Sequence, residues 1–272
     1  MIIVGENING TIPEVKKIML DQDRDGLLKL TKSQVSAGST FIDVNVGTGI
    51  GSRQDELAAM QWAIDVIQKE MDIPICIDSA DPLIIEKGLE IRNGSSSLIN
   101  SVKAEDKNLK KIVRLAKHHN TKLVGLAMNE TGIPETENER LNACRKIAGV
   151  CRENGFPMEN LYFDPLVIPI SADARQGMVT LKTISAIKRE FPDAKTIMGL
   201  SNVSYGLPGR SRLNAAFLHM AIYAGLDAVI LNPLDEEVMS ALKTVRAITG
   251  QDRHFRRYMR AFRKPAKERS TK

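Results

Sequence analysis

The sequence has few of the side chains that metal and redox sites commonly use. It contains only four histidines and three cysteines in 272 residues. The cysteines, Cys76, Cys144 and Cys151, are odd in number and widely spaced, which argues against both a disulfide framework and a zinc-binding pattern. We therefore expect all three to be buried, reduced thiols.

The histidines give no sign of a catalytic or metal centre. His118, His119, His219 and His254 fall in expected helices or in the basic C-terminal segment, and none of them directly follows an expected strand. The sequence also lacks the Gly-x-Ser-x-Gly elbow of serine hydrolases, and no Cys–His nucleophile pair can be argued. We predict that the protein holds no metal.

Long apolar runs are absent as well. No segment approaches the roughly 18 consecutive apolar residues that a membrane-spanning helix needs. The chain enters an apolar run at residues 2–4, without the basic segment that opens a secretory signal. We expect a cytoplasmic protein with no membrane partner.

A glycine-rich stretch at residues 47–51 resembles a phosphate-binding loop only superficially. Ser52 stands where the dinucleotide-binding pattern requires its third glycine, and the stretch lacks the lysine of a P-loop. The pattern favours a flexible loop over a phosphate cradle.

What the sequence does contain is one repeated unit. Eight short apolar runs each end at an acid, an amide or a hydroxyl, and a helical pattern follows each run. The expected strands are residues 2–5, 40–46, 75–78, 98–100, 123–128, 161–163, 196–200 and 228–231. This alternation, in a chain near the roughly 250 residues of a typical barrel, predicts an α/β fold: a single-domain (β/α)8 TIM barrel over residues 1–250. An open, doubly wound parallel sheet is the alternative.

The polar residues at the strand ends predict a binding site. In such barrels the C-terminal ends of the strands form one shared mouth. Asp78, Asn100 and Asp164 end three of the runs. A carboxylate can accept hydrogen bonds from an amino group and a neighbouring ring N–H together, and an amide can satisfy a ring carbonyl or imine nitrogen. The set therefore favours a pterin-like 2-amino-4-oxo heterocycle, although each group could instead cap the helix after it.

Several of these strand-end segments together resemble a known family. The sequence is similar to the pterin-binding methyltransferases, which include the methyltetrahydrofolate:corrinoid protein methyltransferases and the folate domain of cobalamin-dependent methionine synthase. Dihydropteroate synthases are a more distant branch. The resemblance spans about residues 1–250, and the segments that carry it are residues 5–10, 43–47, 77–79, 99–101, 128–134, 164–166 and 198–204.

The resemblance implies a function for the strand-end residues. It implies a homodimeric barrel that binds tetrahydrofolate, with a separate corrinoid protein presenting the cobalt of its cobalamin to N5. Asp78, Asn100 and Asp164 match the residues that hold the pterin, and Asn202 matches the catalytic amide that assists protonation of N5. Arg210 also matches the family's pattern.

The remaining candidate residues are less specific. Asp43 and Asn45 are expected to support the pterin-binding residues or to line the rim of the site. Arg210 could contact the aminobenzoyl-glutamate tail of the folate or the corrinoid protein, or it could be a solvated loop charge. Residues 205–209 depart from the more polar loop found in the methyltetrahydrofolate:corrinoid protein methyltransferase of acetogens. The identity of the corrinoid partner therefore stays open, as do the original methyl donor and the direction of transfer.

Two other functions are compatible with the fold. A dihydropteroate-synthase-like condensing enzyme would need a lysine near the later strands, and residues 201–210 contain none. A non-catalytic folate-binding barrel would not need the complete set of polar strand ends.

The C-terminal segment, residues 251–272, differs in composition from the barrel. Residues 253–272 contain six Arg and three Lys against one Glu. Phe255, Tyr258 and Phe262 are spaced so that the rings lie near one helix face. A final helix packed on the barrel is the favoured interpretation. Docking to an acidic corrinoid protein is the second, and binding to nucleic acid, which nothing else supports, is the third.

Overall fold

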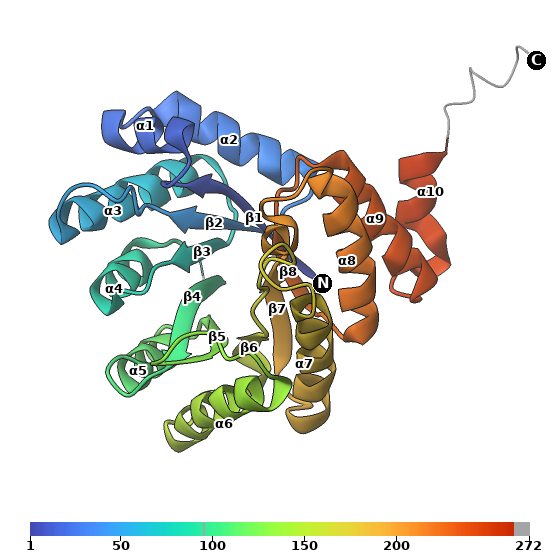
Figure 1. Ribbon diagram of the computed structural model, residues 1–272. Coiled ribbons are helices and arrows are strands. Elements are labelled where there is room, and N and C mark those ends of the chain that lie inside the picture. The colour runs from blue at the N-terminus through green and yellow to red at the C-terminus, as the bar shows by residue number, and fades with distance from the viewer. Residues whose placement is uncertain (95, 264–272) are drawn as a thin grey trace, which may run out of the picture.

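Eight parallel strands close into a barrel in the order of the chain (Figure 1). The computed structural model describes residues 1–94 and 96–263. The strands are β1 (Ile2–Asn9), β2 (Phe41–Asn45), β3 (Ile75–Asp78), β4 (Ser97–Ala104), β5 (Lys122–Asn129), β6 (Leu161–Asp164), β7 (Lys195–Gly199) and β8 (Ala228–Leu231). The predicted single (β/α)8 barrel is confirmed, and pairing of β1 with β8 excludes the open sheet.

Helices surround the strands on the outside (Figure 1). They are α1 (Pro13–Asp21), α2 (Arg24–Ala37), α3 (Arg53–Glu70), α4 (Pro82–Ile91), α5 (Leu109–His118), α6 (Glu137–Glu153), α7 (Gln176–Glu190), α8 (Arg210–Ala224) and α9 (Glu236–Ile248). Short 3-10 turns are η1 (Met158–Asn160) and η2 (Leu200–Ser204). Helix α1 was not expected. It is only nine residues long, and its apolar face is small, with Val15 and Met19 buried.

Two strands run further towards the mouth than the sequence predicts. Strand β1 continues past Gly5 to Asn9, with a shift in its pairing to β2 between Gly5 and Ile8. Strand β4 likewise continues past Asn100 to Ala104. The polar residues inside these strands interrupt the apolar pattern, but they lie at the mouth, where a strand can carry polar side chains without ending.

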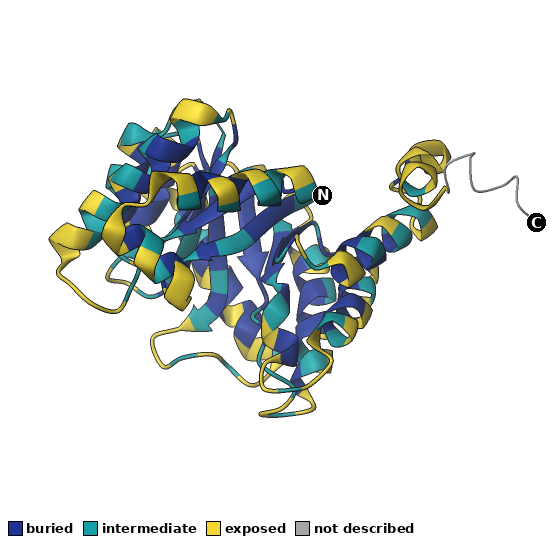
Figure 2. Cartoon of the chain, turned by 90° about the horizontal axis from the view of Figure 1, so that it is seen from above, coloured by how far each residue is buried: buried dark blue, intermediate teal, exposed yellow. Residues whose placement is uncertain are grey.

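The core lies inside the barrel and between the strands and helices, where Figure 2 shows most residues buried. One buried cluster takes side chains from all eight strands and fills the barrel interior: Val4, Phe41, Cys76, Leu98, Val124, Tyr162, Ile197, Ala228 and Ile230. The two other clusters join strands to the surrounding helices. Cys76, Cys144 and Cys151 are all buried and free, which confirms the prediction made for them.

The C-terminal segment forms a short turn and helix against α9. These are η3 (Arg253–Phe255) and α10 (Arg256–Phe262), and Asp252 accepts a hydrogen bond from the Tyr258 backbone N–H at 2.8 Å. The rings of Tyr258 and Phe262 lie 4.7 Å apart, as the spacing predicts, but Phe255 is 56% exposed rather than packed on the barrel. The end of the basic segment, residues 264–272, lies outside the described residues.

Helix α10 lies at the end of the barrel opposite the mouth. A cavity of about 420 Å³ separates it from the core and is lined by Ile3, at the start of β1, by Gly38 and by Arg260. In Figure 2, α10 stands away from the strands and is almost wholly exposed. Among the described residues, no helix is long and apolar enough to cross a membrane.

Candidate active site

The strand ends bring the expected residues to one end of the barrel. Asp43 and Asn45 belong to β2, Asp78 ends β3, Asn100 lies in β4 and Asp164 ends β6. Because all eight strands are parallel and the sheet is closed, their C-terminal ends share one mouth. Asn202 lies in η2, which directly follows β7.

Strands β2, β3 and β4 form one polar cluster. Asn45 Nδ2 donates a hydrogen bond to Asp78 Oδ2 at 2.8 Å, and Asp78 lies opposite Asn100 in the pairing of β3 with β4. Asp43 is 4% exposed and lies against Cys76, Asp78 and Asn100. The Asn45 amide thus fixes the orientation of one carboxylate that faces the mouth.

Asp43 and Asp78 are close enough that their negative charges repel each other. Burial raises the pKa of Asp43 well above its ordinary value, and the negative charge of Asp78 raises it further. Burial also raises the pKa of Asp78, while hydrogen bonds from Asn45 and Asp43 oppose the rise. The deeper Asp43 therefore favours its protonated form, which leaves Asp78 as the carboxylate that can accept donors from a ligand.

Asp164 ends β6 and so lies apart from the cluster on β2, β3 and β4. It is 8% exposed, and its Oδ1 accepts a hydrogen bond from the Leu166 backbone N–H at 2.7 Å. Burial raises the pKa of Asp164 to about 7, against the opposing effects of that hydrogen bond and of the Arg140 charge. Asp164 does not cap α7, because that helix begins at Gln176, so the capping alternative fails for this residue.

The Asn202 amide is available for a ligand. Within the described residues its side chain makes no hydrogen bond, although its backbone C=O accepts one from the Tyr205 N–H at 3.1 Å. A Cβ atom at Gly199 would lie 3.3 Å from Asn202 Nδ2, so glycine at that position leaves the amide its space.

Arg210 holds the turn that carries Asn202. Its Nη2 donates to the Ser201 C=O at 2.7 Å, and its Nε donates to Ser204 Oγ at 3.1 Å. Both acceptors lie in η2, on either side of Asn202. Arg210 is exposed to solvent, and these contacts make it a brace for the turn.

Glu6 is a site residue that the sequence interpretation did not select. It lies in β1, and its Oε1 accepts a hydrogen bond from Ser201 Oγ at 2.6 Å. Burial raises the pKa of Glu6, while the bond from Ser201 and the Arg210 charge lower it. The only signal in the sequence was the position of Glu6 after the first apolar run. Its hydrogen-bond partner, Ser201, is distant in the chain, so no local pattern links the two residues.

The side-chain amides of Asn7, in β1, and Asn232, directly after β8, bind each other rather than facing the open mouth. Asn7 Nδ2 donates to Asn232 Oδ1 at 2.9 Å, which closes the barrel between its first and last strands. The glycine-rich residues 47–51 form a turn at the rim between β2 and α3. No cluster of three His, Cys, Asp or Glu that could hold a metal ion occurs among the described residues.

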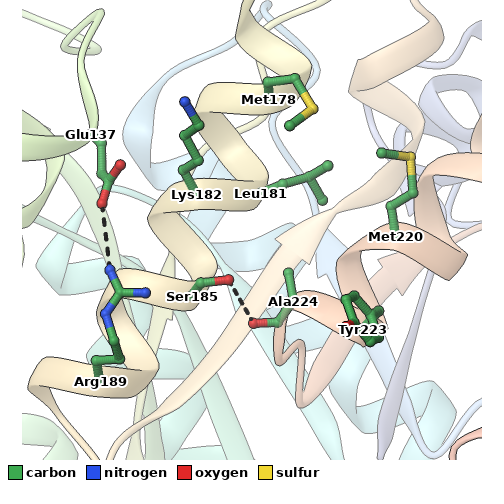
Figure 3. Close-up of a pocket in the computed structure, with 9 residues that line it drawn as sticks. All are labelled: Glu137, Met178, Leu181, Lys182, Ser185, Arg189, Met220, Tyr223 and Ala224. Carbon is green, nitrogen blue, oxygen red and sulfur yellow. Dashed lines mark hydrogen bonds and ion pairs between the residues drawn. The ribbon is translucent and has the colours of Figure 1, made fainter.

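A separate groove lies on the outer face of the barrel, away from these strand ends. Its volume is about 390 Å³, and it runs between α7 and α8 (Figure 3). Met178, Met220 and Tyr223 expose apolar surface along it, and Tyr223 is 88% exposed. At its edge Arg189 pairs with Glu137. The groove is lined by side chains of the outer helices and by none of the strand-end residues that line the mouth.

Comparison with known proteins assigns the family. Residues 7–232 match the pterin binding enzyme family. The chain belongs to this family. The enzyme is also 30% identical over 265 residues to the methylcorrinoid:tetrahydrofolate methyltransferase of Eubacterium limosum, and the match covers 97% of this chain and 96% of the relative. The resemblance to the pterin-binding methyltransferases that the sequence motifs carry is thereby confirmed.

Further relatives of this pterin-binding enzyme are consistent with the family assignment. It is 28% identical over 246 residues to the methionine synthase of Mycobacterium tuberculosis, a match that covers 85% of this chain and only 20% of that longer protein. Its fold is similar to the crystal structure of 7,8-dihydropteroate synthase from Vibrio fischeri, with a TM-score of 0.71, 18% identity and coverage of 92% and 93% of the two chains. A Yersinia pestis dihydropteroate synthase gives a TM-score of 0.68 at 16% identity, covering 92% of this chain and 94% of the other.

Proposed function

We propose that this enzyme moves a methyl group between N5 of tetrahydrofolate and the cobalt of a separate corrinoid protein. The observation that carries the proposal is the convergence of Asp78, Asn100 and Asp164 with the unbonded Asn202 amide at one barrel mouth. Nearly full-length similarity to a methylcorrinoid:tetrahydrofolate methyltransferase supports it.

Acceptor groups on several strands would hold the pterin ring. Asp78 and Asp164 accept the hydrogen bonds of the 2-amino group and the adjacent ring N–H, and the Asn100 amide satisfies the ring oxygen or nitrogen beside them. Asp43 and Asn45 position Asp78, the first from beneath it and the second by its 2.8 Å hydrogen bond. Leaving one buried ring donor unpaired costs about 1–3 kcal/mol, so these contacts determine folate affinity.

Asn202 would act at the other end of the pterin, where the methyl group leaves or arrives. When the methyl group leaves N5, the electron pair of the broken bond stays on nitrogen, and N5 must gain a proton. A positioned amide stabilises the positive charge as it develops, and such a fixed dipole is worth more in a pocket than in water. Arg210 and Glu6 hold the Ser201 end of the turn, so they position this amide without contacting the ring.

The partner supplies the other half of the reaction. The corrinoid of a separate protein gives or takes the methyl group through its cobalt, and the mouth is where the two substrates would meet. Tetrahydrofolate is therefore a substrate here, and cobalamin belongs to the partner. We place the enzyme in the cytoplasm, where the sequence features led us to expect it.

We also propose that the enzyme is a homodimer. The apolar groove between α7 and α8 supports a contact with a second copy, because Met178, Met220 and Tyr223 are exposed there together. The groove lies on the outer face of the barrel, so a second copy on it would leave the mouth open.

A cobalt assay tests the reaction directly. The protein is mixed with Co(I) corrinoid and methyltetrahydrofolate, and formation of methylcobalt is followed by absorbance. We expect transfer by the wild type, and transfer slowed roughly 10- to 1000-fold by Asn202→Ala, the range expected for loss of one preorganised donor. An Asn202→Ala rate constant equal to the wild-type value in single turnover would remove Asn202 from the mechanism, and no transfer by the wild type would refute the function.

A dihydropteroate-synthase-like condensation is the second candidate. Similarity to the Yersinia pestis and Vibrio fischeri dihydropteroate synthases, at 16% and 18% identity, extends to the fold only. Residues 201–210 contain no lysine for a pyrophosphate leaving group. Methyl transfer remains the better supported reaction.

A further inference from the structure

A fully buried arginine lies beside the pterin site without an acidic partner. Arg140, in α6, is 0% exposed and is among the largest fully buried side chains. It forms no ion pair within the described residues. A buried charge is costly unless other groups compensate it, and a cation in the first turns of a helix is also placed unfavourably with respect to the helix dipole. The burial of Arg140 therefore suggests that its charge has a functional role.

The Arg140 guanidinium is satisfied by the loop that follows β6. Nη1 donates to the C=O groups of Pro165 at 2.9 Å and Leu166 at 2.8 Å. Nη2 donates to Gln176 Oε1 at 2.8 Å, and Nε donates to the Pro134 C=O at 3.0 Å. A single side chain thus joins the loop before α6 to the loop after β6 and to α7.

Leu166, whose C=O accepts one of these hydrogen bonds from Arg140, has an unfavourable backbone conformation. Leu166 has a φ of 66°, in the left-handed region that non-glycine residues seldom occupy. Its C=O accepts hydrogen bonds from both Arg140 and Thr180 Oγ1, the latter at 2.9 Å. Its N–H in turn donates to Asp164 Oδ1 at 2.7 Å. The Pro165 C=O, which also accepts a hydrogen bond from Arg140, belongs to the same peptide unit as the Leu166 N–H. Arg140 therefore reaches the Asp164 carboxyl through that peptide unit, and the strained turn directs the carboxyl.

Arg140 also acts on Asp164 through its charge. Burial raises the pKa of Asp164 to about 7, and the nearby Arg140 charge opposes that rise. A second titratable group near Asp164 is the Cys144 thiol, also from α6, and burial raises its pKa above its ordinary range. From α7, Gln176 contacts Arg140 and Thr180 contacts the Leu166 C=O, and neither side chain titrates. Strand β5 places Leu126 opposite Asp164.

We propose that Arg140 is a positioning residue for the pterin site: it fixes the turn after β6 and supplies the positive charge that allows Asp164 to bind the ring as a carboxylate. The inference rests on the proposed function, since it requires Asp164 to accept the donors of the pterin. It adds a residue on the outer layer of the barrel, which does not touch the ligand, to the binding machinery.

Two variants separate the charge of Arg140 from its geometry. Arg140→Met removes both, whereas Arg140→Lys keeps the charge and loses the fork that spans two carbonyl groups. Arg145→Met is the matched control, because Arg145 lies on the same helix but at the surface, paired with Glu190 at 2.7 Å. Thermal unfolding checks that each variant is folded.

The first readout needs no ligand. Carboxyl ¹³C NMR of the free protein follows the titration of Asp164, with Asp164→Asn identifying the resonance. We expect the pKa of Asp164 to rise above its value of about 7 in Arg140→Met. It should stay near the wild-type value in Arg140→Lys and in Arg145→Met, because both keep the buried positive charge.

The second readout is tetrahydrofolate affinity measured by calorimetry against pH. At pH 7 we expect binding about tenfold weaker or more in Arg140→Met, the effect of losing one buried hydrogen bond to the ring. The pH at which affinity falls should move upward with the pKa of Asp164. Arg140→Lys should weaken binding several-fold without moving that pH, and Arg145→Met should change neither.

The outcomes distinguish this inference from the function on which it rests. Suppose that the wild type binds tetrahydrofolate, and that folded Arg140→Met shows the same Asp164 pKa and the same affinity as the wild type. That result overturns the role of Arg140 and leaves the proposed function standing. If Arg140→Met does not fold, Arg140→Lys decides, and wild-type affinity in that variant overturns the role. A wild-type protein that binds no tetrahydrofolate overturns the pterin site and the role of Arg140 together.

Discussion

At the residue scale, Asp164 combines two opposing requirements. Its carboxyl is nearly inaccessible to water, so the folded protein favours the protonated form, with a pKa of about 7. A pterin with two donors favours the carboxylate. Binding a ligand therefore needs a charge state that the free protein resists, and Arg140 reduces the cost without removing it.

This conflict predicts that Asp164→Asn raises the stability of the free protein and lowers its affinity for tetrahydrofolate. Because the folded-state pKa is raised, the stability from the protonated carboxyl is fully present below about pH 4 and is lost as the pH rises through about 7. Asparagine has no charge to bury, and its oxygen can still accept the Leu166 N–H. At pH 8 the free variant should be more stable than the wild type by about 1–4 kcal/mol, and its tetrahydrofolate affinity should be about tenfold lower or weaker still.

Denaturant unfolding at pH 5 and pH 8 measures the first effect, and calorimetry measures the second. The difference in unfolding free energy between variant and wild type should be small at pH 5 and should grow towards pH 8. A difference that stays constant across this range would mean that Asp164 does not titrate near neutral pH in the free protein.

At the scale of elements, the turn η2 is the part of the site that depends most on neighbours. It carries Asn202 directly after β7, and it is held at Ser201 by Arg210 from α8 and by Glu6 from β1. The turn is therefore fixed by elements at both ends of the chain. A loose turn would leave the Asn202 amide present but badly placed.

The brace gives a prediction for Arg210→Gln. Losing the hydrogen bonds to the Ser201 C=O and Ser204 Oγ should let the turn move, so kcat for methyl transfer should fall about 10- to 100-fold, the cost of a misplaced catalytic group. Folate affinity should change little, because Asp78, Asn100 and Asp164 are untouched. Steady-state kinetics of Arg210→Gln and of Arg212→Gln, an exposed arginine in the same helix, make the comparison.

The same kinetics decide between two roles for Arg210. An effect confined to KM for folate would indicate the contact with the aminobenzoyl-glutamate tail that the sequence left open. An effect on kcat alone supports the brace, and Arg212→Gln should match the wild type in either case.

At the scale of the whole molecule, the two ends of the barrel have different surfaces. The mouth carries the polar groups of the site, while basic helix α10 lies beneath the opposite end, next to the start of β1. The described part of the basic segment is therefore remote from the place where a corrinoid partner would meet the folate. The outer groove between α7 and α8 faces neither end.

The groove predicts the oligomeric state. We expect sedimentation velocity to give the mass of a homodimer, and Tyr223→Asp to give monomers, because a charge there would be buried against the second copy. Ile248→Asp is the control, since Ile248 is 78% exposed but does not line the groove. A wild-type monomer at tens of micromolar would contradict the proposal, and a dimer unaffected by Tyr223→Asp would place its interface elsewhere.

The sequence by itself determined the barrel and the residues that line its mouth. Period and order alone bring Asp78, Asn100, Asp164 and Asn202 to one end of the barrel, because parallel strands in a closed sheet all run towards the same end. Local signals also suffice for helix starts such as Asp81, whose Oδ1 accepts the Leu83 N–H at 2.9 Å. Helix α1 was missed because it is a short helix of nine residues that precedes the longer α2 in the same connection between β1 and β2.

Only the tertiary structure decided what supports those residues. Glu6 meets Ser201 across almost the whole chain, and Arg140 reaches Asp164 through the peptide unit between Pro165 and Leu166. An arginine in a polar helix has no sequence mark that distinguishes it from its exposed neighbour Arg145. Burial and hydrogen-bond partners separate the two, and these depend on contacts between distant segments, which no local pattern encodes.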